Sequence, residues 1–386
     1  MTAFPPPPID TINWSNVGFN MSEVNGHIES TYSRTTSQWS PLRFVADPYI
    51  RLHGMSPALN YGQQSAEGLK AFRGPNNKTI AIFRPDRNAH RMQHSADVAS
   101  MPHVPVDMFV QACRSVVALN ACYVPPHESE AALYLRPQLY GSSPQLSLAA
   151  PEEFTFCVYA VPTGGMISRG PSPVTALILD DFDRTAPNGS GHAKLGGNYA
   201  PVIRWSDKAR KDGFGLTLHL DSAKHEYIDE FSSCAFVGVK SNPDDENDVT
   251  ILIPDSKCII DSITSQSIAQ ISRSFGWKVE KRPVKYTELP DLSEVLAVGT
   301  AAIIVPVRSI TRRQNSGLLV PGPRVSIDRA SEKVTYIPDS HAEAGPVCAK
   351  LLTRFKEIQL ALTEDTFGWR FEVTEADMRV ENYATS

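Results

Sequence analysis

The stretch Gly189-Ser190-Gly191-His192-Ala193-Lys194-Leu195-Gly196-Gly197-Asn198-Tyr199 surrounds one lysine with four glycines. Because glycine has no side chain, a ligand can lie close to this backbone while the Lys194 amine reaches it. A lysine held near an aldehyde can lose its proton and bond to the carbonyl carbon. The window therefore predicts a covalently bound aldehyde cofactor. The alternative for the same pattern is a flexible surface loop with a solvated lysine.

Five further motifs lie along the chain in a fixed order: Asn60-Tyr61-Gly62, Glu67-Gly68-Leu69-Lys70-Ala71-Phe72, Phe83-Arg84-Pro85, Tyr134-Leu135-Arg136-Pro137 and Val298-Gly299-Thr300-Ala301. Together with the lysine motif they resemble the branched-chain amino-acid aminotransferases, which are fold-type IV enzymes that use pyridoxal 5'-phosphate (PLP). The resemblance runs from about residue 40 to near the C-terminus. Several ordered motifs are far more specific than one Gly-rich pattern.

This resemblance implies an α/β (α+β) architecture with two domains, namely a smaller N-terminal α/β domain and a larger C-terminal mixed β-barrel-like domain. A chain of 386 residues is long enough for about two domains. The polar, Pro/Ser/Thr-rich start predicts a loosely ordered leader. We expect these boundaries: a leader at 1–40, the small domain at 41–161, a breaker-rich linker at 162–173 and a PLP-binding domain at 174–386.

Hydrophobic periodicity predicts the local elements. In the first part we expect a strand, turn and strand at 71–83, a helix at 106–120, and strands at 131–139 and 154–161. In the second part we expect strands at 174–179, 216–220, 235–239 and 249–253, and helices at 263–275 and 292–296. The acidic run 242–248 indicates a solvated hairpin loop between two of these strands.

Composition excludes several classes of protein. The formal net charge is −5 without a long run of either sign, so neither nucleic acid nor an anionic membrane is an expected partner. The six cysteines have no metal-ligand spacing, and His90 and His94 lie in a segment that predicts a solvated polar face, so we expect no metal site. The N-terminus lacks an apolar segment of signal-peptide length, which makes the cytoplasm the expected location.

The resemblance assigns roles around the cofactor ring. Lys194 would bond to PLP and act as the general base. Tyr199 would donate a hydrogen bond to the phenolic oxygen, with simple packing as the alternative. Glu230 would bind the pyridine nitrogen, because an anion there raises the pKa of that nitrogen. Asp229 is the competing choice, since neighbouring strand residues point to opposite faces.

Phosphate binding is expected from two kinds of donor. Arg84 can hold an anion through two N–H groups, and its alternative is a surface arginine at a strand end. Ile263 and Thr264 open a predicted helix, whose backbone N–H groups and positive end attract phosphate oxygens. Thr300 would complete the site. The alternative for these segments is ordinary caps and turns.

Substrate recognition is expected at one face of a strand. Tyr134 and Arg136 are alternate residues and so share a face, and their match to the family's Tyr-x-Arg implies L-amino acids. The resemblance also implies a homodimer in which the partner subunit supplies one tyrosine. The remaining expected substrate-binding residues are Tyr61 from the partner, Ala66, Ser233, Thr300 and Ala301.

Three positions depart from the family. Ala66 replaces an aromatic residue that would bury roughly 150 Å² or more, so we expect bulkier apolar substrates, unless Phe182 or an aromatic of the leader fills the space. A Cys-x-x-Cys after Gly299-Thr300-Ala301 is absent, which removes thiol regulation there. Ala235 replaces an asparagine, without a consequence that the sequence reveals.

The expected protein is a cytoplasmic, homodimeric PLP-dependent L-amino-acid aminotransferase. It would exchange an amino group between a branched-chain or bulkier apolar amino acid and 2-oxoglutarate, in amino-acid biosynthesis or specialised metabolism. A D-amino-acid transaminase, an (R)-amine transaminase or a PLP lyase of the same fold stays open. A catalytically silent PLP-fold protein is the non-enzyme alternative. Such a protein would need neither a base nor an electron-sink carboxylate, so the presence of both argues against this alternative.

Overall fold

The computed structural model describes residues 4–164, 172–314 and 316–383, and the chain divides into two compact units. Unit 1 comprises Met1–Arg169, Ala193–Gly197 and Lys356–Ser386, and unit 2 comprises Gly170–His192 and Asn198–Phe355. The sequence-based division gave everything after residue 173 to the second domain. The structure instead groups both Ala193–Gly197 and Lys356–Ser386 with unit 1, so the unit that contains the N-terminal part is not the smaller of the two.

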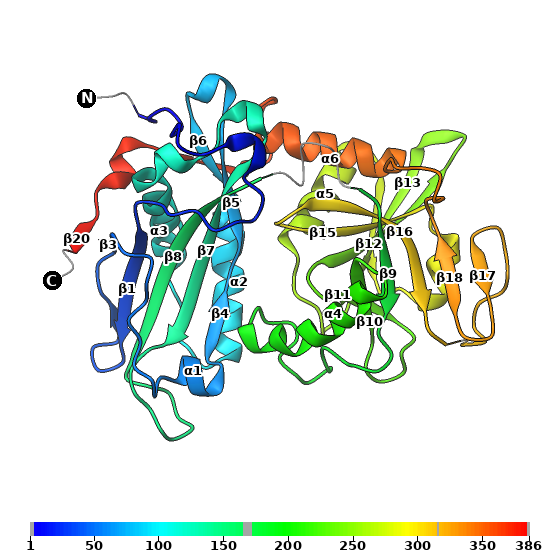
Figure 1. Ribbon diagram of the computed structural model, residues 1–386, viewed down its shortest axis with the longest axis horizontal. Coiled ribbons are helices and arrows are strands. Elements are labelled where there is room, and N and C mark those ends of the chain that lie inside the picture. The colour runs from blue at the N-terminus through cyan, green and yellow to red at the C-terminus, as the bar shows by residue number, and fades with distance from the viewer. Residues whose placement is uncertain (1–3, 165–171, 315, 384–386) are drawn as a thin grey trace. The chain divides into compact units, whose positions relative to one another are not determined.

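Unit 1 contains one sheet with the strand order β19-β6-β5-β7-β8-β1-β3-β20, where β2 also pairs with β1 and β4 with β7. The described strands are β1 (His27–Ser33), β2 (Gln38–Trp39), β3 (Arg43–Val45), β4 (Gln64–Ala66), β5 (Leu69–Arg73), β6 (Ile80–Phe83), β7 (Ala132–Gly141), β8 (Glu153–Thr163), β19 (Arg370–Val373) and β20 (Glu381–Tyr383). Strand β20, from the C-terminal part of the chain, pairs in parallel with β3, from its N-terminal part, so both lie in one sheet (Figure 1).

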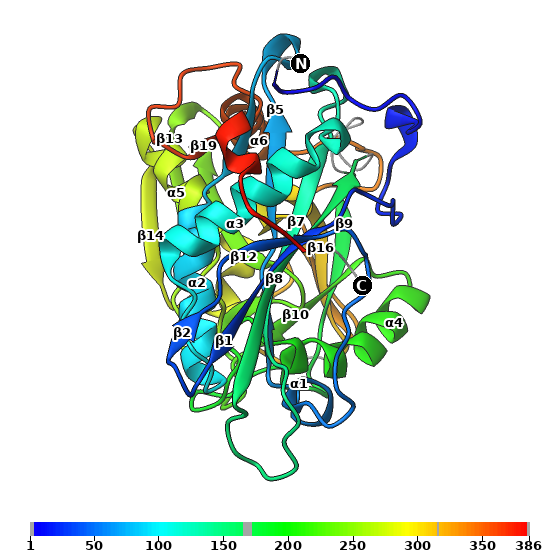
Figure 2. The ribbon, with the colours of Figure 1, turned by 90° about the vertical axis from the view of Figure 1, so that its left-hand side faces the viewer.

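Helices α2 (Pro85–Val98) and α3 (Val106–Leu119) cover one face of this sheet (Figure 2). Of the apolar positions that predict α3, Phe109, Cys113, Val116 and Val117 are buried in the core, and Leu119 is partly buried against it. The predicted hairpin at 71–83 is confirmed as β5 and β6. Its turn places Asn76 at φ 56°, a left-handed conformation that asparagine tolerates.

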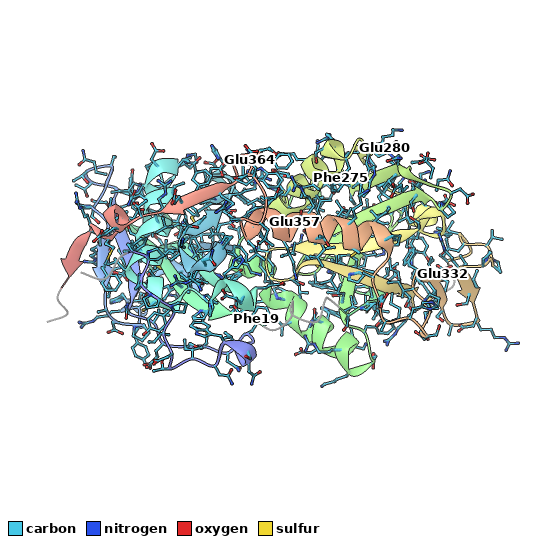
Figure 3. The ribbon with its side chains drawn as sticks, turned by 90° about the horizontal axis from the view of Figure 1, so that it is seen from above. Phe19, Phe275, Glu280, Glu332, Glu357 and Glu364 are labelled. Atoms are coloured by element: carbon cyan, nitrogen blue, oxygen red, sulfur yellow. The ribbon has the colours of Figure 1, made fainter. Side chains whose placement is uncertain are left out.

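The N-terminal segment differs from the expected loose leader. Strand β1 pairs with β8 from Ile28 to Ser33, and Ile28 is fully buried. Further upstream, Arg73 Nη2 donates a hydrogen bond to the Pro6 carbonyl at 2.7 Å. Phe19, which Figure 3 labels, lies on this segment and is 52% exposed. The polar composition of this segment therefore did not predict strand β1, which hydrogen-bonds to β8 in the sheet of unit 1.

Unit 2 contains a second sheet with the order β11-β10-β9-β16-β15-β12-β13-β14, and β18 pairs with both β16 and β17. The described strands are β9 (Val174–Ile178), β10 (Leu216–Leu220), β11 (Ile228–Phe231), β12 (Ala235–Asn242), β13 (Asp245–Pro254), β14 (Lys278–Arg282), β15 (Glu294–Gly299), β16 (Ile303–Arg312), β17 (Val325–Ile327) and β18 (Glu332–Thr335). The remaining helices are α1 (Pro57–Tyr61) in unit 1, α4 (Ile203–Lys211) and α5 (Ile263–Ser274) in unit 2, and α6 (Pro346–Gln359), within which the division between the units falls.

The predicted strands of unit 2 and helix α5 are confirmed, whereas the predicted helix at 292–296 is wrong. That segment leads into β15, because Val295-Leu296-Ala297-Val298 is a continuous apolar run buried in the sheet. A five-residue window is too short to distinguish the two periods. The turn of the acidic hairpin is also tighter than expected, since β13 begins at Asp245. Among the described helices, none is both long and apolar enough to cross a membrane.

Candidate active site

Strand β4 and helix α2 fix the backbone around Lys194 within unit 1. The Lys194 carbonyl accepts a hydrogen bond from the Ala66 N–H at 3.2 Å, and Leu195 forms an antiparallel bridge with Ser65. The Lys194 N–H donates to Ser95 Oγ at 2.9 Å. A Cβ at position 196 would overlap the Gln64 side-chain oxygen, which explains one glycine of the motif. The lysine is thus held on a fixed backbone, in contrast to the flexible-loop alternative.

Arg84 lies at the junction of β6 and α2. It is the N-cap residue of α2 in a left-handed conformation, with φ 51° and ψ 47°. Its N–H donates to the Trp369 carbonyl at 2.8 Å, and its guanidinium carbon lies 4.8 Å from the Trp369 ring centroid. Arg84 is 5% exposed. Arg84 is therefore a buried arginine that stacks on an aromatic ring, and not the solvated surface arginine of the alternative.

The expected substrate residues of unit 1 share one face of its sheet. Arg136 Nη2 donates to the Tyr134 hydroxyl at 3.3 Å. Ala66 lies opposite Gln138 in the pairing of β4 with β7, so its methyl group projects on the same face as these side chains. Gly68 is explained by close approach, because a Cβ there would overlap the Tyr134 hydroxyl. The structure therefore brings Ala66, Tyr134 and Arg136 to one surface.

Tyr61 ends helix α1 and is partly exposed. Its hydroxyl donates a hydrogen bond to the Leu146 carbonyl, which ties α1 to the loop between β7 and β8. Leu146 and Leu148 of this loop are 76% and 87% exposed. Met55 and Leu59 are exposed nearby in the sequence. We call these five residues the α1–loop patch. Large exposed apolar side chains in one region are typical of protein interfaces.

In unit 2, strand β11 buries two adjacent carboxylates. Glu230 Oε1 accepts a hydrogen bond from the Ile260 N–H at 3.4 Å and forms an ion pair with Arg184 Nη2. Arg184 also donates to the Gly191 carbonyl at 3.4 Å, and its side chain is 1% exposed. Burial raises the pKa of Asp229, against smaller opposing contributions from neighbouring groups. Glu230, which is paired with a cation, is therefore the better of the two candidates.

A neutral histidine accompanies this pair. Burial, and then the charge of Arg184, lower the pKa of His219 to about 3. Its Nε2 lies 2.7 Å from Ser232 Oγ. The imidazole therefore carries no charge near neutral pH, and Arg184 is the cation that balances Glu230.

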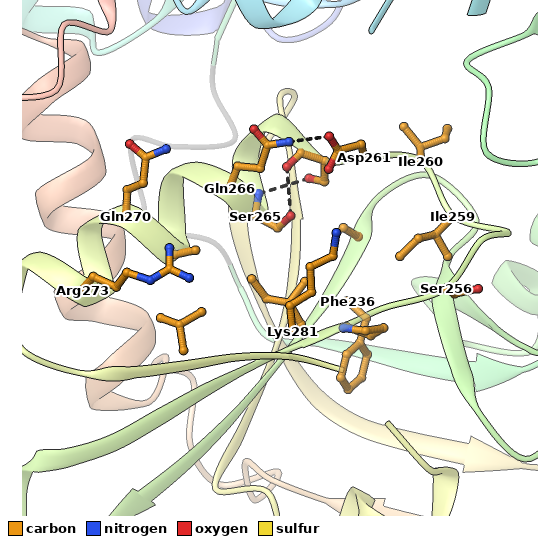
Figure 4. Close-up of a pocket in the computed structure, with 16 residues that line it drawn as sticks. Phe236, Ser256, Ile259, Ile260, Asp261, Ser265, Gln266, Gln270, Arg273 and Lys281 are labelled. Carbon is orange, nitrogen blue, oxygen red and sulfur yellow. Dashed lines mark hydrogen bonds between the residues drawn. The ribbon is translucent and has the colours of Figure 1, made fainter. Parts of the chain in front are cut away.

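Helix α5 begins as predicted. Ser262 is its N-cap, with Oγ accepting from the Ser265 N–H at 3.2 Å, and Ile263 and Thr264 form the buried first turn. A cavity of about 280 Å³ runs along one face of α5, and Gln266 donates to Asp261 at its edge at 2.6 Å (Figure 4). Its lining includes Ala235, the position of the missing asparagine, and the cations Arg273 and Lys281.

Ser233, Thr300 and Ala301 lie just outside the ends of β12 and β15, and Tyr199 lies just before α4. Because Ala235 pairs with Val298, the residues just outside this pair lie side by side, and a Cβ at Gly299 would lie 3.3 Å from Cys234 Cβ. This arrangement brings Ser233 close to the turn of Thr300 and Ala301, while Tyr199 and Ser233 line a second cavity of about 290 Å³. Phe182 stacks on Trp205, with ring centroids 5.7 Å apart.

Sequence reasoning missed the polar partners of the expected residues. Arg184 is the cation that ends an acidic run. Because a buried glutamate needs a counter-ion, this arginine could have been predicted as the partner of Glu230. Asn88, Arg91 and Ser95 recur at helical spacing along α2. The predicted solvated polar face of this helix holds for the exposed His90, but Asn88 and Ser95 are buried.

Comparisons with known proteins identify the family of the chain. The profile of the amino-transferase class IV family matches residues 66–310. Aminotransferase poxL of Penicillium oxalicum is 50% identical over 373 residues, covering 96% of each chain. Branched-chain amino acid aminotransferase gloG of Glarea lozoyensis is 42% identical, over 96% of this chain and 99% of that one. A solved branched-chain amino acid aminotransferase complexed with N-(5'-phosphopyridoxyl)-L-glutamate, from the organism abbreviated T.th., has a TM-score of 0.67 at 21% identity, covering 91% of this chain and 100% of that one.

The chain belongs to the class IV aminotransferase family. Its two sheets confirm the predicted α/β fold-type IV architecture, and membership of the family makes it a PLP-dependent transaminase rather than a silent binding protein. The donor types in each unit suit parts of this cofactor. Unit 1 holds a lysine amine and a buried arginine, which suit an aldehyde and a phosphate, and unit 2 holds a helix N-terminus and a buried glutamate, which suit a phosphate and a ring nitrogen.

Proposed function

We propose that this transaminase is a homodimer that exchanges the amino group of a branched-chain or bulkier apolar L-amino acid with 2-oxoglutarate. The observation that carries the proposal is the common face of Ala66, Tyr134 and Arg136 in unit 1. An apolar surface beside a tyrosine and an arginine suits a site that must accept an aliphatic side chain in one half-reaction and a carboxylate in the other.

Relatives support the same substrate classes. The Glarea lozoyensis relative is named as a branched-chain amino acid aminotransferase, and the T.th. enzyme was solved with a phosphopyridoxyl-glutamate compound. PLP, when bound, supplies the electron sink that stabilises negative charge at the substrate α-carbon. In this chain Nζ of Lys194 would take the α-proton and return it to the cofactor side.

The other expected residues would hold the reactants in place. Glu230 would keep a proton on the ring nitrogen, and Tyr199 would donate to the phenolic oxygen. The phosphate would be bound by Arg84, Ile263, Thr264 and Thr300. Substrate would be bound by Tyr134, Arg136, Ser233, Thr300, Ala301 and the partner's copy of Tyr61. A cytoplasmic location stays a prediction from the sequence.

A single-turnover panel tests this function. L- and D-enantiomers of valine, leucine, phenylalanine and glutamate, and (R)-1-phenylethylamine, are mixed with the PLP form, and the cofactor absorbance is followed. We expect reaction with the apolar L-amino acids and L-glutamate. Preference for D-amino acids or the amine would assign the chain to another transaminase class of the same fold.

The α1–loop patch supports the homodimer, because its exposed leucines and Tyr61 need a partner surface. Leu148→Asp should convert the protein to monomers in sedimentation velocity and abolish most of the activity. Leu362→Asp, which alters another exposed leucine of unit 1, is the matched control and should remain dimeric. A fully active wild-type monomer would refute the dimer.

A further inference from the structure

A buried glutamate lies next to the strand that holds Lys194. Glu67 directly follows β4 and is 1% exposed. Arg91 donates two hydrogen bonds to the Glu67 carboxylate, from Nε to Oε1 and from Nη2 to Oε2, both at 2.7 Å. Asn88 Nδ2 donates to Oε2 at 2.8 Å, and the Gly68 N–H donates to the same oxygen at 3.2 Å. Such a carboxylate has a fixed position and a fixed orientation.

The same helix joins this pair to the lysine backbone. Ser95 Oγ donates to the Arg91 carbonyl at 3.0 Å and accepts from the Lys194 N–H at 2.9 Å. Asn88, Arg91 and Ser95 lie three and four residues apart and so occupy one face of α2. One helix therefore orients Glu67 with two side chains and holds the Lys194 main chain with a third.

Charge couples Glu67 to Lys194. Burial alone would raise the pKa of Glu67, but the charge and hydrogen bonds of Arg91, the charge of Lys194 and the Asn88 hydrogen bond lower it on balance. On helix α3 the Cys113 thiol also responds to Glu67, and burial together with this carboxylate raises its pKa, so it stays neutral. Lys194 is thus one of the cations that favour the ionised form of the Glu67 carboxyl.

We propose that Glu67, Arg91 and Ser95 are positioning residues for Lys194: Ser95 fixes its main chain, and the Glu67 carboxylate, oriented by Arg91, is the counter-ion of its amine whenever that amine is not bonded to cofactor. This inference rests on the proposed role of Lys194. It adds a reason for a buried glutamate at this point of the motif. The cluster sets how readily the amine becomes a nucleophile.

Labelling of the cofactor-free dimer tests the charge coupling without catalysis. The apo-protein is pulsed with acetic anhydride between pH 6 and 11, and modification of Lys194 is measured by mass spectrometry of its peptide. Lys278, whose side chain is 69% exposed, is the internal reference. In Glu67→Gln the Lys194 profile should move to lower pH by about one unit, because the ammonium loses its counter-ion.

Glu29→Gln is the matched control, because Glu29 is a partly buried strand glutamate of unit 1 that also pairs with an arginine, Arg43. It should leave the Lys194 profile unchanged. Glu67→Asp withdraws the charge by one methylene and should give a smaller shift in the same direction. Equal Lys194 profiles in wild type and Glu67→Gln overturn the proposal. Borohydride fixing PLP at another lysine would instead refute the role of Lys194, and the labelling result would still stand.

A second variant pair tests the backbone contact independently. Ser95→Ala removes the acceptor of the Lys194 N–H, so the dissociation constant for PLP should rise several-fold and borohydride should fix less cofactor. Ser115→Ala removes another fully buried serine hydroxyl of unit 1, which accepts from Gln111, and should leave PLP binding unchanged. Equal PLP affinities in the two variants would refute the role of Ser95, whether or not Glu67→Gln folds.

Discussion

Each unit contains a buried glutamate that is paired with an arginine, Glu67 with Arg91 in unit 1 and Glu230 with Arg184 in unit 2, and the two pairs are built differently. In unit 1, Arg91 engages both oxygens of Glu67, and Asn88 adds a third donor. In unit 2, the contacts of Glu230 with Arg184 and with the Ile260 N–H both fall on Oε1. The first pair is held against rotation, whereas these contacts of the second pair engage only one oxygen.

The difference shows how one chemical pair can serve two purposes. Removing one partner of a buried ion pair typically costs about 3–5 kcal/mol, so both pairs need their arginine for folding. The Glu67 carboxylate, which accepts hydrogen bonds on both oxygens, suits the proposed role of a fixed charge near Lys194. The Glu230 carboxylate, which accepts from an arginine and a backbone N–H on Oε1, suits the proposed contact with the ring nitrogen.

Removal of Lys194 should have the largest effect, because it is the group that Glu67 is proposed to serve. Lys194→Ala should lose the covalent cofactor and at least about 10³-fold of its activity, since both the nucleophile and the base are gone. Borohydride reduction followed by peptide mass spectrometry checks this result, with Lys278→Ala as control. Cofactor fixed at a different lysine would contradict the assignment.

Glu230→Gln should have the next largest effect. The variant should bind PLP yet turn over about 100-fold more slowly, equivalent to a loss of about two pKa units at the ring nitrogen. Stopped-flow absorbance measures the half-reaction with L-leucine. Asp229→Asn is the matched control, because burial already raises the pKa of Asp229. A larger loss in Asp229→Asn than in Glu230→Gln would transfer the role to Asp229.

The pH dependence of stability should separate Glu67 from Asp229. The folded-state pKa of Glu67 lies below its usual value of 4.5, so its stabilisation is present above that pH and is lost as the pH falls through the folded value. For Asp229 the shift is upward, so its contribution is lost as the pH rises through the raised value. Melting temperatures at pH 4 to 8 should show Glu67→Gln most destabilised at the upper end, whereas Asp229→Asn should gain relative stability there. The same pH trend in both variants would contradict the opposite shifts.

Ala66→Phe should have the smallest effect, confined to substrate size. The added ring lies on the face shared with Tyr134 and Arg136 and should lower kcat/KM for phenylalanine and bulkier 2-oxo acids by about tenfold, a change of about 1.4 kcal/mol. Valine and leucine serve as control substrates and should be spared. An equal loss for both classes would mean that Ala66 does not enlarge the pocket.

The sequence predicted the fold-determining elements where the pattern was long and regular. Helix α3 has four apolar positions at helical spacing, and the hairpin of β5 and β6 has asparagines where its turn needs a left-handed backbone. Prediction from the sequence failed where the amino-acid composition of a segment did not reflect its strand pairing. Strand β1 lies in a polar segment and is ordered by six residue pairs with β8, and β15 lies in an apolar run too short to reveal its period.

The sequence by itself determined the family and the identities of the chemical groups, because a Gly-rich lysine motif, Arg84, Tyr134-x-Arg136 and Glu230 are local patterns that survive without a structure. Only the tertiary structure decided which partners orient those groups. Arg91 lies 24 residues from Glu67, Arg184 lies 46 residues from Glu230, and Ser95 lies 99 residues from Lys194. Hydrogen bonds and ion pairs depend on distance in space rather than in sequence, so the cluster around Lys194 exists only once α2 has packed against β4.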